Sequence, residues 1–274
     1  MKFESLKEKC EYYRGLNDSR LVPNSYVMVM LDGRSFSKNI KNHFKKPFDE
    51  DFIEMMNETA KYVCANVQGC KMAYTQSDEI SLIITDFEDV NTDSFFGFRN
   101  NKLHSIIASL ATSKFNQLMI KYAFENAAIV KAEFNIKDIK NIIDTTKLYQ
   151  FDCKCWNVPS CNDAFAWLLH RQIDCIRNSK QQTAQSYLSH KELAGNECDK
   201  QIEMLKDAHG IDWYTEYNDG MKYGRFIYRD KEHFVSDKYG EYERTVWNSH
   251  YAFPLMEEGG KERFNELNLI PKLS

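Results

Sequence analysis

Three acidic residues stand next to apolar segments, and their spacing could create a site for metal ions. Asp32 follows the apolar run Tyr26–Leu31, whereas Asp78 and Glu79 interrupt a second apolar segment, residues 72–85. If these segments are neighbouring strands of one sheet, Asp32 and Asp78 project from the same edge. Their carboxylates would repel each other there unless a cation lies between them. The pattern therefore indicates a divalent metal site at a sheet edge, with Glu79 in a supporting role.

The backbone after Asp32 suits the same chemistry. Mg²⁺ prefers hard oxygen ligands, which the Asp32 and Asp78 carboxylates and the Gly33 carbonyl could supply, and it retains phosphate oxygens in its shell. The amides of residues 34–37 could face a triphosphate where a helix begins, and Arg34 adds positive charge. Two ions held in this way would polarise the phosphates of a nucleotide and activate an attacking hydroxyl. The plainer alternative is that Asp-Gly and Ser-Asp-Glu form ordinary turns.

These acids need a sheet to position them, and the apolar pattern predicts one. The run Tyr26–Leu31 is typical of a buried central strand, and the residues around Asp78 predict a hairpin. Asp49 is placed to cap a helix whose apolar residues follow helical spacing. Further elements are expected in this order: a helix over Asn100–Phe124, strands over Ala128–Phe134 and Tyr149–Trp156, and a helix opened by Pro159 and Asn162. The order β-α-β-β-α-β-β-α predicts a mixed sheet with helices packed on it, an α+β fold.

The last third of the chain is richer in polar residues. Ser189 and Glu192 have the spacing of a capping box, and Asp219-Gly220 predicts a turn before a strand. We therefore expect a catalytic domain over residues 1–180. A smaller helical and β-hairpin extension over residues 181–274 is expected to pack on it as one structural unit.

Composition excludes several classes of protein. The 274 residues are 43% hydrophobic and 28% charged, as in ordinary globular proteins, and a net charge of -4 argues against a generic polyanion binder. The N-terminal residues lack the apolar stretch of a signal peptide, and the longest apolar run, Val27–Leu31, is too short to span a bilayer. The sequence thus predicts a cytoplasmic protein without a membrane partner, which would hold any nucleic acid through local basic patches.

The eight cysteines favour reduced thiols over a disulfide framework, because their spacing is irregular. Cys153, Cys155, Cys161 and Cys175 cluster loosely, but the sequence has no C-x-x-C and no paired histidines there. Core thiols are therefore preferred to the alternative of a zinc site. In a strand, the C-x-C spacing would point the first two thiols to one face.

Five segments together resemble the tRNA-His guanylyltransferase superfamily. In chain order they are MLDGRSFSK (Met30–Lys38), KKPFD (Lys45–Asp49), AYTQSDEISLII (Ala73–Ile84), FDCKCWNVP (Phe151–Pro159) and RQIDCIRNS (Arg171–Ser179). They are similar to the family's D-G-R-x-F, K-P-x-D, Q-S-D-E, F-D-x-[RK] and R-Q-x-D motifs. The likeness spans roughly residues 1–230 in order, which makes it more specific than any single motif.

The resemblance implies a fold like the palm of nucleic-acid polymerases, with a ferredoxin-like antiparallel sheet. It also implies addition of nucleotides to the 5′ end of RNA, in the 3′–5′ direction. ATP or GTP would activate a 5′-monophosphate tRNA, and the 3′-hydroxyl of an incoming nucleotide would then displace the activating group. Two Mg²⁺ ions, binding of the tRNA acceptor stem and a homotetramer are further implications of the family.

By the same resemblance, the residues that match the family's site would take specific roles. Asp32, the Gly33 carbonyl and Asp78 would hold the metal ions, and Asp32, Asp78 and Glu79 would form the catalytic set. The residues implied to bind nucleotide are Asp32, Gly33, Arg34, Ser35, Phe36, Ser37, Ser77 and Asp78, with Lys46 and Asp49 at the activation step and Arg99 and Lys102 near the phosphates. For Arg99 and Lys102 the alternative is a solvated helix face.

Two departures from the guanylyltransferases proper narrow the prediction. Those enzymes carry a histidine where this chain has Ser37, and an H-I-N-N-L-Y-N segment where it has Ile176–Lys180. The guanylyltransferase-like branch of the superfamily lacks that segment, and it resembles template-dependent repair enzymes of the tRNA 5′ end. Templated 5′-end repair is therefore the leading prediction, and addition of an untemplated G at position -1 of tRNA-His is the alternative. A nucleotidyl cyclase and a non-catalytic RNA-binding protein on the same fold stay open.

Overall fold

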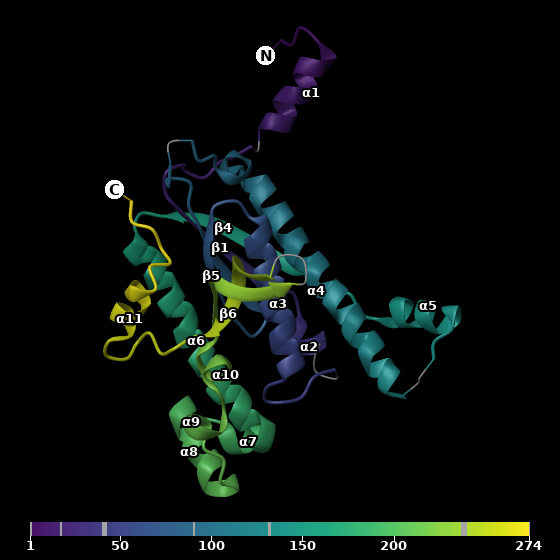
Figure 1. The fold of residues 1–274 in the computed structure, drawn as a ribbon, viewed down its shortest axis with the longest axis vertical. Coiled ribbons are helices and arrows are strands. Elements are labelled where there is room, and N and C mark those ends of the chain that lie inside the picture. The colour runs from purple at the N-terminus through teal and green to yellow at the C-terminus, as the bar shows by residue number, and fades with distance from the viewer. Residues whose placement is uncertain are drawn as a thin grey trace.

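The computed structural model describes residues 2–16, 18–39, 43–89, 91–130, 133–236 and 240–273, and a six-stranded sheet lies at their centre (Figure 1). The strand order is β4-β1-β3-β2-β5-β6, and every neighbouring pair is antiparallel. The strands are β1 (Tyr26–Gly33), β2 (Cys70–Gln76), β3 (Glu79–Ile84), β4 (Phe151–Val158), β5 (Arg225–Ser236) and β6 (Gly240–Tyr251). The strands β5 and β6, which belong to the expected C-terminal extension, continue the sheet beyond β2.

Helices cover both faces of this sheet, with α3 and α4 on one face and α6 and α11 on the other. The helices that frame the sheet are α2 (Phe36–Asn39), α3 (Glu50–Asn66), α4 (Asn100–Val130), α6 (Cys161–Tyr187) and α11 (Gly260–Glu266), with the 3-10 helix η1 (Phe95–Phe98) before α4. The remaining helices are α1 (Leu6–Gly15), α5 (Ile136–Thr145), α7 (His190–Leu193), α8 (Cys198–His209), α9 (Trp213–Glu216) and α10 (Asp219–Tyr223). In Figure 1, α7 to α10 gather around the far end of α6, and α1 and α5 lie away from the sheet. None of the helices in the described ranges combines the length and the apolar character that crossing a bilayer would take.

The strands bury alternate side chains on opposite faces of the sheet. In β1, Val27, Val29 and Leu31 pack with residues of α3 and α4, whereas Met28 packs with residues of α6. Because both faces are covered, the strand is apolar at almost every position. Asp32 continues the alternation at the end of the strand and therefore lies on the α6 face.

The predicted α+β, palm-like architecture is confirmed, and so are several local predictions. Asp49 caps α3 by accepting a hydrogen bond from the Phe52 amide at 3.1 Å. Ser189 and Glu192 form a reciprocal capping box at the start of α7. The thiols of Cys153 and Cys155 lie on one face of β4, with their Sγ atoms 3.7 Å apart.

Two local predictions are wrong. The segment Ala128–Phe134 is not a strand, because α4 continues to Val130 and residues 133–135 are not in any element. The Asp219-Gly220 pair opens α10, which the Asn218 side chain caps, instead of forming the predicted turn, although the predicted strand does follow as β5. A Cβ atom on Gly220 would lie 2.6 Å from the ring of Tyr251, so glycine serves close packing at this position.

Candidate active site

The end of β1 and the tip of the β2–β3 hairpin bring the predicted acids together. Asp32 is in register with Glu79 on β3 and with Asp152 on β4, so side chains at these positions share one face at the end of the sheet. The Gly33 amide donates to the Asp78 carbonyl at 3.1 Å, which ties the end of β1 to the hairpin turn. The fold thus places Asp32, Asp78 and Glu79 in one region.

Glu79 is held in a network of hydrogen bonds and ion pairs. The Gln76 amide donates to its carboxylate at 2.8 Å, and the Arg171 guanidinium of α6 lies 3.3 Å away. Arg171 also pairs with Asp174 one turn later and lies over the ring of Trp167, with its central carbon 5.3 Å from the ring centroid. Burial nevertheless raises the pKa of Glu79, and the Arg171 charge opposes that rise. These contacts fit the supporting role predicted for Glu79.

Asp78 and Asp32 differ from Glu79, because neither has an ion-pair partner among the residues that the structure describes. The Ser77 hydroxyl lies 3.0 Å from the Asp78 carboxylate. Burial raises the pKa of Asp78 to about 6, and the nearby Asp32 charge contributes to the rise. The pKa of Asp32 is raised by burial first and then by the charge of Asp152. Two partly buried carboxylates that repel each other are the electrostatic signature of a cation site.

The donor set fits Mg²⁺ that shares its shell with a ligand. Within the described ranges, no three His, Cys, Asp or Glu side chains gather in a way that could hold a metal ion by themselves. Asp32 and Asp78 offer hard oxygens, and the nearby charges of Lys154 and Arg171 only partly offset the burial of Asp32. Mg²⁺ commonly takes one or two carboxylates and completes its shell with water and phosphate oxygens. The geometry therefore suits a metal that arrives with a nucleotide.

A pocket of about 320 Å³ opens beside Asp78, between the start of α3, the hairpin tip and the middle of α6. We call it the hairpin pocket. Its apolar lining includes Phe36, Phe44, Pro47, Phe48, Phe52, Ile53, Cys175 and Met221. Its polar lining is Lys45, Lys46, Asp49, Gln76, Ser77, Asp78, Asn178, Ser179, Gln182 and Arg225. Aromatic rings beside cationic and amide groups suit a nucleotide, whose base is flat and whose phosphates are anionic.

Several predicted nucleotide-binding residues line the hairpin pocket, namely Phe36, Lys46, Asp49, Ser77 and Asp78. Two of them, Phe36 and Asp49, also have structural roles. Phe36 is only 1% exposed and packs against other aromatic rings of the core. Asp49 accepts from the Phe52 amide with one oxygen and from the Lys45 amide with the other, at 2.8 Å, so it shapes the pocket wall.

The backbone after Asp32 differs in one respect from the predicted triphosphate cradle. The Arg34 amide donates to the Gln150 carbonyl at 2.9 Å, so the prediction that this amide faces a triphosphate is wrong, and the Arg34 side chain is exposed. Ser35 has a φ of 57°, which turns the chain into α2. A Cβ atom on Gly33 would lie 2.5 Å from the Phe36 ring, so this glycine allows the close approach. The side chain of Ser37 lies outside what the structure describes.

The structure does not bring Arg99 and Lys102 to the acids within this chain. Lys102 lies in the first turn of α4, and Arg99 directly precedes that helix. The neighbouring Phe98 carbonyl accepts from the Leu21 amide, so this region lies near the segment that leads into β1 and not at the end of that strand. Arg99 pairs with Asp18 at 2.8 Å, and Lys102 is exposed. Their contact with phosphates stays a prediction.

Three residues of this region had no assigned role from the sequence. Arg171 fixes Glu79, and its signal was the Arg171/Asp174 spacing of one helical turn. Asn178 lines the hairpin pocket within the segment that departs from the guanylyltransferases proper. Arg225 reaches the pocket from β5, and no local pattern indicates it because its position depends on strand pairing.

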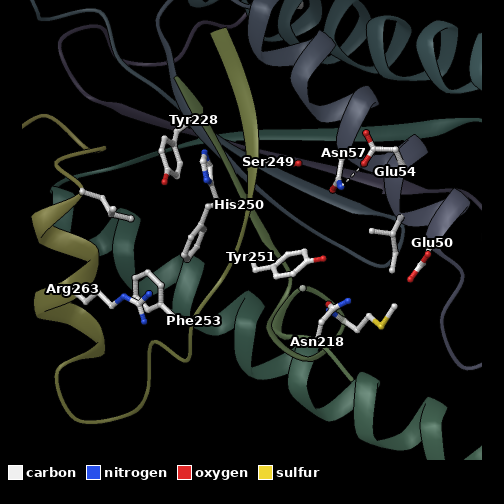
Figure 2. A pocket seen from close by; sticks show the side chains of 15 residues that line it. Glu50, Glu54, Asn57, Asn218, Tyr228, Ser249, His250, Tyr251, Phe253 and Arg263 are labelled. Atoms are coloured by element: carbon white, nitrogen blue, oxygen red, sulfur yellow. Dashed lines mark hydrogen bonds between the residues drawn. The ribbon is translucent and has the colours of Figure 1, made fainter. Parts of the chain in front are cut away.

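A second and larger cavity, of about 850 Å³, adjoins the hairpin pocket, and the two share Ile53 and Met221. Figure 2 shows Tyr228, His250, Tyr251 and Phe253 projecting around it from the end of the sheet. Glu54 and Asn57 of α3 form another part of the wall and are hydrogen-bonded to each other at 3.1 Å. None of the predicted site residues lines this cavity.

Comparisons with known proteins identify related sequences and structures. The family profile described as tRNAHis guanylyltransferase matches residues 6–159. The tRNA(His) guanylyltransferase of Debaryomyces hansenii is 26% identical over 242 residues, which cover 83% of this chain and 82% of that protein.

Solved structures are also similar. A bacterial tRNA(His) guanylyltransferase (Thg1)-like protein in complex with ATP superposes with a TM-score of 0.78 and 26% identity, covering 97% of this chain and 99% of that one. A GTP complex of such a bacterial protein gives a TM-score of 0.69 at 25% identity, covering 98% of this chain and 100% of that one. The tRNA(His) guanylyltransferase of Saccharomyces cerevisiae gives 0.61 at 25% identity, covering 79% and 91%.

Proposed function

This chain belongs to the tRNAHis guanylyltransferase family, and from that membership we propose that it is a nucleotidyltransferase that adds a nucleotide to the 5′ end of a tRNA. The observation that carries the proposal is the pair of partly buried, mutually repelling carboxylates Asp32 and Asp78, of which Asp78 lines the hairpin pocket. The names of the relatives support a tRNA acceptor, and the ATP and GTP complexes of similar proteins support nucleotide substrates.

In this proposal the 5′-monophosphate of the RNA attacks the α-phosphorus of ATP or GTP and releases pyrophosphate. The 3′-hydroxyl of the incoming nucleotide then attacks the activated 5′-phosphorus, loses its proton, and displaces the nucleoside monophosphate. Asp32, the Gly33 carbonyl and Asp78 would hold Mg²⁺, which when bound stabilises charge on the phosphates and favours ionisation of the hydroxyl. Lys46 would offset phosphate charge in the pocket. Glu79, fixed by Arg171, would keep the hairpin tip in place.

Two forms of this activity have separate support. The names of the curated relatives favour addition of guanosine to tRNA-His, which the sequence left as the alternative, over the leading prediction of templated repair. Templated repair has its support in the residues themselves. Ser37 and Ile176–Lys180 depart from the guanylyltransferases proper, and Asn178 of the second segment lines the hairpin pocket. The guanylyltransferase-like structure also superposes with a higher TM-score than the yeast enzyme, 0.78 against 0.61.

Nucleotide addition to defined tRNAs tests the proposal and separates its two forms. Labelled nucleotides would be offered to full-length tRNA-His and to tRNAs that lack one or two 5′ residues, with the opposite-strand base varied. Templated repair predicts that the added nucleotide follows that base, whereas guanosine addition predicts G on tRNA-His whatever the base. Asp32→Ala and Asp78→Ala should abolish both, and Asp144→Ala on the exposed side of α5 should not. Full activity of both site variants would refute the assignment.

The other predicted activities are outcomes of the same assays. A cyclic nucleotide formed from ATP or GTP without RNA would indicate a nucleotidyl cyclase. RNA binding that ignores Mg²⁺ and nucleotide, with no incorporation, would indicate a non-catalytic RNA-binding protein. The homotetramer and the cytoplasmic location stay predictions, which sedimentation and cell fractionation would check.

A further inference from the structure

Arg225 is a buried cation at the wall of the hairpin pocket. It begins β5 directly opposite Thr75 of β2, three residues before Asp78 along the hairpin. Only 3% of the residue is exposed, although it is one of the residues that line the pocket. A cation at such a depth is rarely left without a partner.

Two of its three guanidinium nitrogens are fixed by neighbouring protein groups. Nε donates to the Asn57 side-chain oxygen at 3.0 Å, and Nη1 donates to the Gly220 carbonyl at 3.1 Å. Asn57 in turn donates to Glu54 at 3.1 Å, as Figure 2 shows. Asn57 and Gly220 both line the larger cavity, so these bonds hold the guanidinium from that side.

The third nitrogen, Nη2, is buried and has no acceptor among the residues that the structure describes. Among the described residues, no carboxylate contacts the guanidinium directly, since Glu54 reaches it only through the neutral amide of Asn57. A purely structural arginine that ties β5 to α3 and α10 would need the first two bonds alone. An unsatisfied donor on a pocket-lining cation instead calls for an acceptor from outside the protein.

The surroundings indicate what that acceptor is. Lys45 and Lys46 line the same pocket, so three cationic residues border it. Among its acids, Asp49 already accepts backbone hydrogen bonds with both oxygens, and Asp78 stands at the proposed metal site. The pocket therefore has positive charge that its own acids do not engage, and a doubly or triply charged phosphate would complement it.

We propose that Arg225 binds a phosphate group in the hairpin pocket, as a substrate-binding residue that the family motifs do not include. This inference rests on the proposed nucleotidyl transfer, which supplies two sources of phosphate: the triphosphate of ATP or GTP, and the 5′-phosphate of the RNA. Nη2 donates to a phosphate oxygen, and the Asn57–Glu54 pair orients the guanidinium for that contact.

Calorimetric titration with Mg²⁺ held constant tests the proposal on Arg225→Met, which keeps side-chain bulk and removes the charge. Inorganic tripolyphosphate, ATP, GTP and guanosine are the probes. A charge-assisted hydrogen bond corresponds to roughly a 10- to 100-fold loss of affinity. We expect that loss for the three phosphate ligands, none for guanosine, and a smaller loss in Arg225→Lys. Arg263→Met is the matched control, because that arginine is exposed in the larger cavity over the Phe253 ring.

The two sources of phosphate are separated by titrating acceptor-stem RNA with a 5′-monophosphate or a 5′-hydroxyl end. A loss confined to the nucleotide ligands assigns the triphosphate, and a loss confined to the 5′-phosphorylated RNA assigns the RNA end. Unchanged affinity for both, or an equal loss for guanosine, would overturn the proposal. If Arg225→Met does not fold, Arg225→Lys decides by the same criteria. In the wild type, the Arg225 Nε–H resonance must also shift on adding tripolyphosphate, and its failure to shift would overturn the proposal as well.

This outcome is distinct from failure of the proposed function. Arg225-dependent binding of ATP by a protein that adds no nucleotide to any RNA would refute the transferase activity and leave the phosphate contact standing. Nucleotide addition with unchanged kcat and KM in Arg225→Met would refute the phosphate contact and leave the transferase activity standing.

Discussion

Replacing Asp78 with asparagine is expected to stabilise the metal-free protein at neutral pH while abolishing nucleotide addition. Burial, reinforced by Asp32, raises the pKa of Asp78 from the ordinary 3.8 to about 6. A pKa difference of one corresponds to about 1.4 kcal/mol, so ionising this carboxyl costs the folded state about 3 kcal/mol at most. Because Asp78 keeps partial contact with water, screening reduces the expected cost to about 1–2 kcal/mol. Asparagine has the same shape and carries no charge to desolvate.

The sign of the pH dependence follows from which state holds the proton. Between pH 3.8 and about 6 the folded protein retains the Asp78 proton that the unfolded chain has released, so stability falls as pH rises through this window. Below it, the carboxyl is protonated in both states and the cost vanishes. The advantage of Asp78→Asn should therefore be largest at pH 8 and shrink towards zero near pH 4.

Urea unfolding followed by circular dichroism measures this effect, at pH 4.5, 6 and 8 with a chelator present. Asp144→Asn, at an exposed position of α5, is the control and should give no pH-dependent gain. Added Mg²⁺ should narrow the difference by stabilising only the wild type. An equal gain for Asp78→Asn at all three pH values would show that charge desolvation is not its cause. No gain at pH 8 would refute the electrostatic description of the site.

Three further substitutions probe the supports of the site, each read by urea unfolding. Leu82→Ala removes a fully buried side chain of β3 and should cost about 3–4 kcal/mol, whereas Val235→Ala, at an exposed position, should cost less than about 0.5; similar costs for the two would contradict the assigned core. Asp49→Ala should cost about 1–2 kcal/mol through loss of the α3 cap and of the bond to the preceding loop. Asp49→Asn should recover only the part due to the cap, because its amide nitrogen cannot accept from the Lys45 amide; full recovery would contradict the two-bond role of the carboxylate. Arg171→Met unpairs Glu79 and should cost about 3 kcal/mol at pH 8 but much less at pH 4, where the carboxyl is protonated; a loss independent of pH would mean that packing on the tryptophan ring dominates.

The sheet could be predicted from the sequence because its central strands carry local signals. The run at β1 is apolar on both faces, and the hairpin around Asp78 pairs two such runs across a short turn. The end of α4 carried a misleading signal, since β-branched residues near Val130 resemble a strand when they are viewed alone. Helix propagation favours continuing an existing helix over starting a new element, and so α4 extends to that residue. The turn predicted at Gly220 was wrong for a different reason. The glycine is required there by the Tyr251 ring, which is 31 positions away in the sequence.

The candidate site was predictable only where its residues come from neighbouring strands. Asp32 and Asp78 could be joined by assuming that two apolar segments pair, which the sheet register confirms. Arg225 could not be assigned to the site from the sequence. Its strand, β5, pairs with β2 across 148 intervening residues, and no pattern in its own segment reveals that partner. Arg171 had a visible spacing to Asp174, yet its contact with Glu79 depends on how α6 crosses the sheet.

The adjacent acids Asp78 and Glu79 at the hairpin tip lie in opposite electrostatic environments. This contrast explains how a rigid sheet can hold an unpaired carboxylate in a fixed position. Glu79 lies within β3, where its carboxylate is engaged by Gln76 and Arg171 and anchors the tip to α6. Asp78 lies in the turn, where its backbone is held by the Gly33 amide and its carboxylate keeps no cationic partner. Because the restraints act on the backbone and on the neighbouring residue, the Asp78 carboxylate is fixed in position without being neutralised. A metal ion that neutralises it recovers the free energy that burial of the charge costs, so the same cost that lowers the stability of the metal-free protein favours metal binding.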